Sequence, residues 1–175
     1  MKKLVVFLFL PFLLLSCSST KESKSEKDEL VKNAVESRKY IIKLERLYAN
    51  HGAIFDLMPR ANYIIIDGER AVISTAYFGT QRDIKPIAAI SMRGRAEEYE
   101  VISKQSKGSF DIKMRVNNGG PNTFLVYITI TKGGKANASV SSLRIDNVRY
   151  SGYLVPIPEK YPEFEQELPA EGNMI

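Results

Sequence analysis

The pattern of apolar and polar residues along the chain predicts a mostly β protein. Residues 109–116 are the clearest case, because apolar and charged side chains alternate from Phe110 to Val116, as expected of a strand with one buried face. Other runs rich in β-branched and aromatic residues also predict strands. The predicted strands are residues 38–46, 62–67, 70–78, 87–93, 96–104, 109–116, 123–131, 136–143 and 148–155.

Short glycine-containing turns separate most of these segments. Asp67-Gly68 is a strong hairpin signal, and we also expect turns at Gly94, at 117–121 and at Gly133-Gly134. Short turns join antiparallel neighbours. The sequence therefore predicts an α+β fold that is mostly β, an antiparallel meander of about eight strands. Residues 123–131 are apolar on both faces, which predicts a central strand.

One short N-terminal helix is expected over residues 28–37, where Asp28 can act as the N-cap and apolar residues recur at helical spacing. It would cover part of one face of the sheet. The next segment has two interpretations. We prefer a strand over 38–46 because it is rich in strand formers, but a helix continuing to Asn50 and ending at Gly52 is the alternative. Residues 49–60 predict a loop.

The first residues predict an export signal. Lys2 and Lys3 precede a short apolar run that ends in Leu-Leu-Ser-Cys at Cys17. The run is shorter than the ~20 residues of a membrane-spanning helix. Its end resembles the lipobox of bacterial lipoproteins. That resemblance implies cleavage before Cys17 and lipidation of its sulfur and new amino group. The alternative is an ordinary signal peptide with a chance cysteine.

These features divide the chain into four parts. Residues 1–16 are the expected lipoprotein signal peptide, 17–27 a polar tether, 28–156 a single antiparallel-sheet domain, and 157–175 an acidic, proline-rich tail. A lipidated Cys17 predicts a protein anchored in the cell envelope. We expect the outer membrane of a Gram-negative bacterium, because serine rather than aspartate follows Cys17.

Charge changes this picture little. Residues 17–155 carry a net charge of +7 and residues 156–175 a net charge of −4. A basic body could indicate nucleic acid, but export argues against that partner. A basic face toward anionic lipid or lipopolysaccharide fits better, although scattered surface lysines are the simpler interpretation.

The sequence offers little for catalysis. His51 is the only histidine, and lipidation would leave no free thiol, so no zinc site of the usual nitrogen and sulfur kind can form within one chain. No Gly-x-Ser-x-Gly motif surrounds any serine. We therefore predict no catalytic residue, no metal site and no cofactor.

Four residues are candidates for a binding surface. Tyr77 and Phe78 end a predicted strand, and Arg93 and Arg95 flank Gly94 at a predicted turn. Aromatic and arginine side chains at loop ends are common in recognition surfaces. The simpler interpretation is that the aromatic pair completes the core and the arginines are solvated.

Several short motifs, taken in order, resemble a known family. They cover most of the chain from Val35 to Pro156 and are Tyr77-Phe78-Gly79, residues 95–99, the small-residue strand 136–142 after Gly134, Arg144-Ile145, and residues 150–153. The chain is similar to Gram-negative envelope lipoproteins catalogued as domain of unknown function 4251. The resemblance implies the fold and the cellular location of that family, but it implies no activity.

Two functions follow as hypotheses. The first is a non-catalytic binding or adaptor module of the envelope, whose partner is a protein, a glycan or a lipid. The second is an envelope hydrolase with a carboxylate-based site that the sequence does not reveal.

Overall fold

The computed structural model describes residues 19–50, 52–78, 89–104 and 108–157 and confirms the predicted mostly β fold. A helix, α1 (Ser19–Ser37), precedes the strands. The strands are β1 (Lys39–Tyr48), β2 (Ile54–Asp56), β3 (Tyr63–Asp67), β4 (Arg70–Ala76), β5 (Ala89–Lys104), β6 (Ser109–Asn117), β7 (Thr123–Thr131), β8 (Lys135–Ser142) and β9 (Val148–Pro156).

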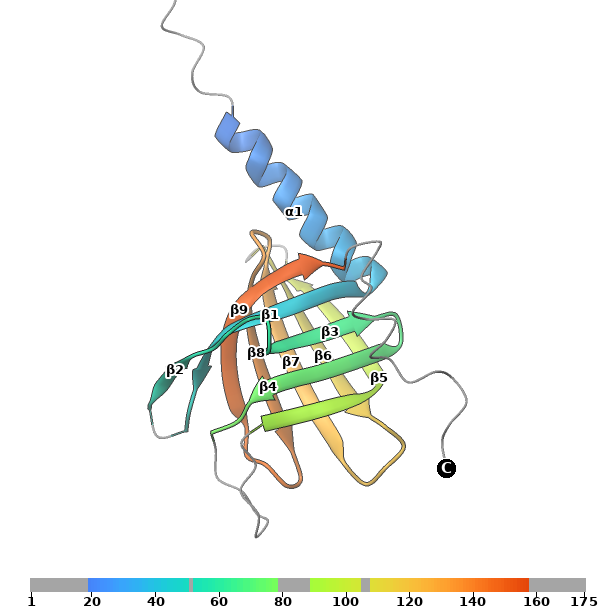
Figure 1. Cartoon of the computed structure of the whole chain (residues 1–175). Helices are drawn as coiled ribbons and strands as arrows, with labels where there is room; N and C mark the ends of the chain where they lie inside the picture. The colour runs from blue at the N-terminus through green and yellow to red at the C-terminus, as the bar shows by residue number, and fades with distance from the viewer. Residues whose placement is uncertain (1–18, 51, 79–88, 105–107, 158–175) are drawn as a thin grey trace, which may run out of the picture.

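The strands form an antiparallel meander that closes on itself (Figure 1). From β3 to β9 each strand pairs with the next strand in sequence. On one side β1 pairs with β3 and, farther along, with β2; on its other side it pairs with β9 from Tyr40 to Tyr48. The β1–β9 pairing joins the two ends of the meander, and the sequence did not predict it.

The interior of the closed sheet is filled by side chains. Inward, buried positions alternate with outward positions along β6, β7 and β8, and the inward residues of the sheet form one apolar cluster. Eight strands enclose a space just wide enough for such side chains. The interior is therefore a packed core.

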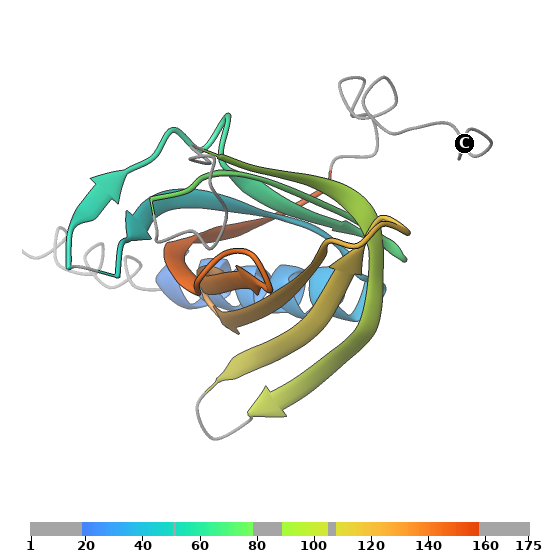
Figure 2. The ribbon, with the colours of Figure 1, turned by 90° about the horizontal axis from the view of Figure 1, so that it is seen from below.

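Helix α1 covers one end of this core (Figures 1 and 2). Val31, Ala34 and Val35 are buried in the same apolar cluster as the inward strand residues, and Val31 lies beside Gly134 in the β7–β8 turn. Leu30, which is also apolar, is 54% exposed. The helix thus closes an end of the sheet rather than covering a face.

The helix begins earlier than predicted. We expected residues 17–27 to form a flexible tether, but α1 starts at Ser19. This stretch contains lysine and glutamate and lacks proline and glycine, and helix propagates easily from an existing turn. Arg38, with φ 54°, ends the helix and turns the chain into β1.

The preferred interpretation of residues 38–46 is confirmed, because β1 is a strand and extends to Tyr48. The expected loop at 49–60 is wrong in part, because it contains the short strand β2. Three β2 residues pair with the end of β1, from Arg46 to Tyr48. Such a short strand has too few residues to show an alternating pattern.

The predicted turn at Gly94 is wrong. Residues 89–104 form the single strand β5, whose first part pairs with β4 and whose last part pairs with β6. Gly94 lies where the strand passes from one partner to the other. A Cβ atom there would lie closer than 3.0 Å to the Asn117 backbone, so glycine permits close approach of two strands.

The other predicted turns are present, and Gly68, Gly119 and Gly134 have positive φ angles. No helix of the described residues is both long enough and apolar enough to cross a membrane. The predicted signal peptide, Cys17, His51 and the tail beyond Ile157 lie outside the described residues.

Candidate functional site

The structure separates the four residues that the sequence singled out. Tyr77 is 1% exposed and belongs to the core, whereas Phe78 is 47% exposed and stacks on Phe55 with 4.6 Å between ring centroids. The simpler interpretation therefore holds for Tyr77 but not for Phe78. Tyr77 cannot contribute to a surface.

Arg93 and Arg95 lie exposed on β5, far from the two aromatics. Arg95 stands opposite Arg70, at the start of β4, and forms an ion pair with Glu69. Tyr77 follows the far end of β4, seven residues from Arg70, or about 23 Å along the strand. The four residues do not form a single binding surface.

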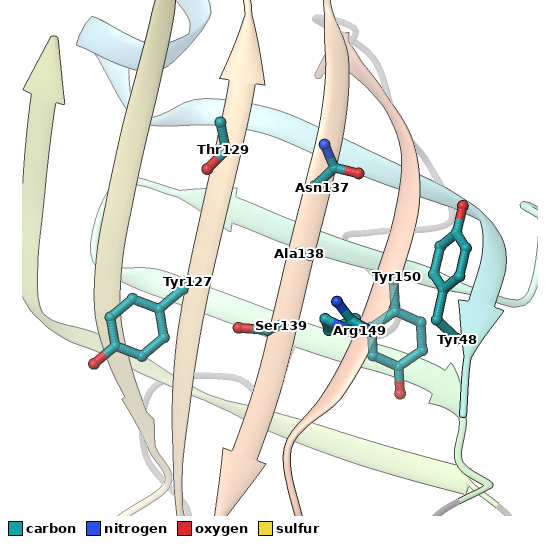
Figure 3. A pocket seen from close by; sticks show the side chains of 8 residues that line it. All are labelled: Tyr48, Tyr127, Thr129, Asn137, Ala138, Ser139, Arg149 and Tyr150. Carbon is teal, nitrogen blue, oxygen red and sulfur yellow. The ribbon is translucent and has the colours of Figure 1, made fainter. Parts of the chain in front are cut away.

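A different feature of the sheet is the candidate binding site. A hollow of about 360 Å³ opens on the outer face of β7, β8, β9 and the end of β1 (Figure 3). This volume lies at the small end of the ~300–1,000 Å³ typical of small-molecule sites. Its lining residues are Tyr48, Tyr127, Thr129, Asn137, Ala138, Ser139, Arg149 and Tyr150.

Strand register places four of these residues in one row. Tyr127 pairs with Ser139, Ser139 with Arg149, and Arg149 with Tyr48. Paired residues of neighbouring strands share a face and lie about 5 Å apart. The two tyrosines therefore stand at the ends of a row about 14 Å long.

The residues between the tyrosines are small or flexible, which makes the surface concave. Ser139 lies beside Tyr127, and Thr129 and Asn137 form the neighbouring row. Ala138 and Tyr150 belong to the buried core and border the hollow from beneath. Short side chains between two aromatic walls leave the space that a ligand could fill.

The two walls differ in rigidity. The Tyr48 hydroxyl lies 3.0 Å from Ser151 Oγ, so the ring is held against the seam between β1 and β9. Tyr127 is 46% exposed, and within the described part of the chain its hydroxyl has no hydrogen-bond partner. Tyr127 therefore offers both a ring face and a free hydroxyl.

Arg149 is the one charged residue among the eight that line the hollow. It is exposed, and among the described residues none forms a hydrogen bond or ion pair with its side chain. The nearest carboxylate in the neighbouring row, Asp111, accepts a hydrogen bond from Thr129 at 2.9 Å and pairs with Lys104. The hollow consequently has a net positive character.

The interior contains tyrosines that burial keeps neutral. Burial is the main cause that raises the pKa values of Tyr40, Tyr77, Tyr99 and Tyr150. The Tyr40 and Tyr99 hydroxyls lie 2.9 Å apart, and Tyr150 donates to the Ala76 carbonyl at 3.0 Å. These hydroxyls form hydrogen bonds with one another or with the backbone, so they contribute to the stability of the fold.

Nothing in the described ranges resembles a metal centre, since no three Asp, Glu, His or Cys side chains gather there. Exposed carboxylates instead pair with arginines. Glu98 accepts a hydrogen bond from Arg115 at 3.0 Å, and Asp56 accepts one from Arg46 at 3.3 Å.

The sequence profile of the family described as "Domain of unknown function (DUF4251)" matches residues 22–154, from α1 to β9. The chain belongs to the DUF4251 family. No curated protein matches it.

A solved DUF4251 structure has a similar fold. It is the crystal structure of a DUF4251 family protein from Bacteroides eggerthii DSM 20697, with a TM-score of 0.65 and 12% sequence identity. The alignment covers 78% of this chain and 91% of that chain. At this identity the likeness concerns the fold alone.

Sequence reasoning missed the hollow of this DUF4251 chain, although one signal pointed to it. The apolar residues on both faces of 123–131 predicted a central strand. In the structure β7 has neighbours on both sides, but Leu125 is 39% exposed and Tyr127 is 46% exposed. Large apolar residues on an outer face that nothing covers are candidates for binding.

Proposed function

We propose that this DUF4251 protein is a non-catalytic binding module of the cell envelope. A lipid on Cys17 holds it at the membrane, and its ligand binds in the hollow between Tyr127 and Tyr48. The outer membrane of a Gram-negative bacterium is the proposed location.

The observation that carries the proposal is the arrangement of the hollow itself. It combines two tyrosines, a few polar side chains between them and an arginine that no other described residue engages. Such a combination of apolar surface with a few placed polar groups is typical of ligand sites. The interior of the closed sheet, by contrast, is occupied by apolar side chains of the described strands.

The proposed anchor fits the position of α1. The helix starts two residues after Cys17 and contains 19 residues, which span about 28 Å. Its first part projects away from the sheet (Figure 1). A lipid at Cys17 would therefore be separated from the closed sheet by a helical spacer. This spacer would keep the hollow accessible above the membrane surface.

The anchor has a direct test. Replacing Cys17 with alanine should leave an uncleaved precursor without a thioether lipid, measured by mass spectrometry of the membrane fraction. A mutant that is processed and retained in membranes like the parent would refute lipidation at this residue.

The ligand site can be tested by filling the hollow. The full chain, tagged at its C-terminus, is purified from its own membranes, and bound material is identified by mass spectrometry. Ser139→Trp places a large ring on the floor of the hollow. Ser91→Trp is the matched control, because Ser91 is an exposed outward residue of β5. We expect Ser139→Trp alone to lose a bound species. Identical bound material from all three proteins would overturn the proposal.

A further inference from the structure

We infer that the hollow binds an anionic saccharide, a short oligosaccharide that carries a carboxylate or a phosphate. This inference rests on the proposed binding function and names its ligand class.

We infer the acidic group of the ligand from Arg149. It is the one charged residue of the lining, and within the described part of the chain its guanidinium has no partner. A guanidinium presents parallel N–H donors that match carboxylate or phosphate oxygens. A ligand that carries a carboxylate or a phosphate could therefore form an ion pair with the Arg149 guanidinium.

We infer the sugar rings of the ligand from Tyr48 and Tyr127. The C–H groups of a pyranose ring carry partial positive charge and pack on the electron-rich face of an aromatic ring. Tyr127 is exposed, and Tyr48 is held in place by its contact with Ser151. The ~14 Å between the two tyrosines exceeds the size of a lone phosphate ion. A short oligosaccharide can span that distance.

The floor supplies partners for sugar hydroxyls. Asn137 and Ser139 offer an amide and a hydroxyl, and no hydrogen bond joins either side chain to another described residue. These groups both donate and accept, as sugar hydroxyls do. Their spacing across two rows suits a ligand with hydroxyls on several sides.

Other occupants fit less well. An acyl chain offers no acceptor to Arg149 and no hydrogen-bond partner to Asn137 or Ser139. An extended peptide usually adds to an exposed strand edge. In this region β7, β8 and β9 each pair on both sides, so no edge is free there.

The test is a titration of the full chain, inserted in zwitterionic nanodiscs, by isothermal calorimetry. The probes are a glucuronate-containing tetrasaccharide, its carboxyl-reduced neutral counterpart, a phosphorylated tetrasaccharide and sodium phosphate. We expect one of the acidic tetrasaccharides to bind about tenfold or more tightly than the neutral one. Comparison of the two acids identifies the acidic group, and phosphate alone should bind far more weakly.

Two variants separate the contribution of Arg149 to binding from that of Tyr127. Arg149→Gln should remove the preference for acid, so that acidic and neutral tetrasaccharides bind alike. Tyr127→Ala should weaken both by a similar factor. Arg60→Gln, an exposed arginine before β3, is the control and should change neither.

The inference is overturned if neutral and acidic sugars bind equally to the parent, or if Arg149→Gln leaves the preference intact. It is also overturned if no tetrasaccharide binds while Ser139→Trp still abolishes capture of a membrane species. In that last case the binding function stands and only the ligand class fails.

Discussion

Gly152 of β9 lies against the backbone of Lys43 in β1, so closely that a Cβ atom at Gly152 would stand less than 3.0 Å from the Lys43 carbonyl oxygen. Real Cβ atoms essentially never approach another atom so closely. The contact lies beside an irregularity in the β1–β9 register, between Leu44 and Arg46. Glycine at this position therefore lets the two ends of the meander meet. The same seam holds Tyr48, one wall of the hollow.

Gly152→Ala should destabilise the protein, because the added methyl group forces the backbones of β1 and β9 apart. We expect the free energy of unfolding to fall by about 1–3 kcal/mol, measured by urea denaturation. Gly133→Ala is the control, since nothing lies within 4 Å of a Cβ at Gly133. Equal stability of the two variants would argue against a tight seam.

Gly68 tests the β3–β4 hairpin. Its φ is 63° and a Cβ there would meet no atom within 4 Å, so a substitution is strained by backbone conformation alone. Gly68→Val should cost about 1–2 kcal/mol of unfolding free energy. Gly68→Asn should cost less, because asparagine tolerates the left-handed region better. Denaturation midpoints measure both, and an unchanged midpoint for the valine variant would contradict the turn geometry.

The buried tyrosines predict a loss of stability at high pH. Their pKa values are raised in the folded state by burial, so above pH ~10 the unfolded chain loses protons that the folded chain keeps. The contribution of these tyrosines to the unfolding free energy should therefore be constant below that pH and fall above it, by about 1.4 kcal/mol per pH unit for each such tyrosine.

Denaturation of the parent at pH 9 and pH 11 measures the fall. Tyr150→Phe should make it shallower, although loss of the hydrogen bond to Ala76 lowers stability at neutral pH by about 1 kcal/mol. A variant that shows the same alkaline fall as the parent would mean that Tyr150 ionises alike in both states.

The arginines chosen from the sequence should matter little. Arg93 and Arg95 are exposed on β5, and Arg95 pairs with Glu69 at the surface. The double change Arg93→Ala with Arg95→Ala should alter the unfolding free energy by no more than about 0.5 kcal/mol. It should also leave capture at the hollow unchanged. A loss of capture by this variant, with its fold intact, would relocate the site to β5.

Most strands of this fold were predictable because each carries its own local signal, whereas the three residues of β2 are too few to carry one. The alternation of apolar and charged residues predicted β6, and the Asp67-Gly68 turn signal predicted the β3–β4 hairpin. Gly94 misled the prediction, because a glycine that permits close approach of a strand resembles a glycine that makes a turn. Closure of β1 on β9 was not predictable, since it depends on contacts between residues such as Lys43 and Gly152 that lie far apart in sequence.

The candidate site was harder to predict than the fold. Tyr127, Ser139, Arg149 and Tyr48 lie on four strands, and no motif joins them in the sequence. Only the register of the closed sheet brings them into one row. The exposed apolar positions of β7 were visible in the sequence, but alternation alone could not distinguish a buried face from an uncovered one.

The central claim is that the ligand lies against Tyr127 on the outer face. Light-induced crosslinking in living cells tests it most directly, with benzoylphenylalanine in place of Tyr127 or, as control, of Tyr153. Both tyrosines are outward and similarly exposed, at 46% and 38%, but only Tyr127 lines the hollow. We predict an adduct at position 127 that Arg149→Gln removes, and none at position 153. Equal adducts at both positions, or none at 127, would contradict the account.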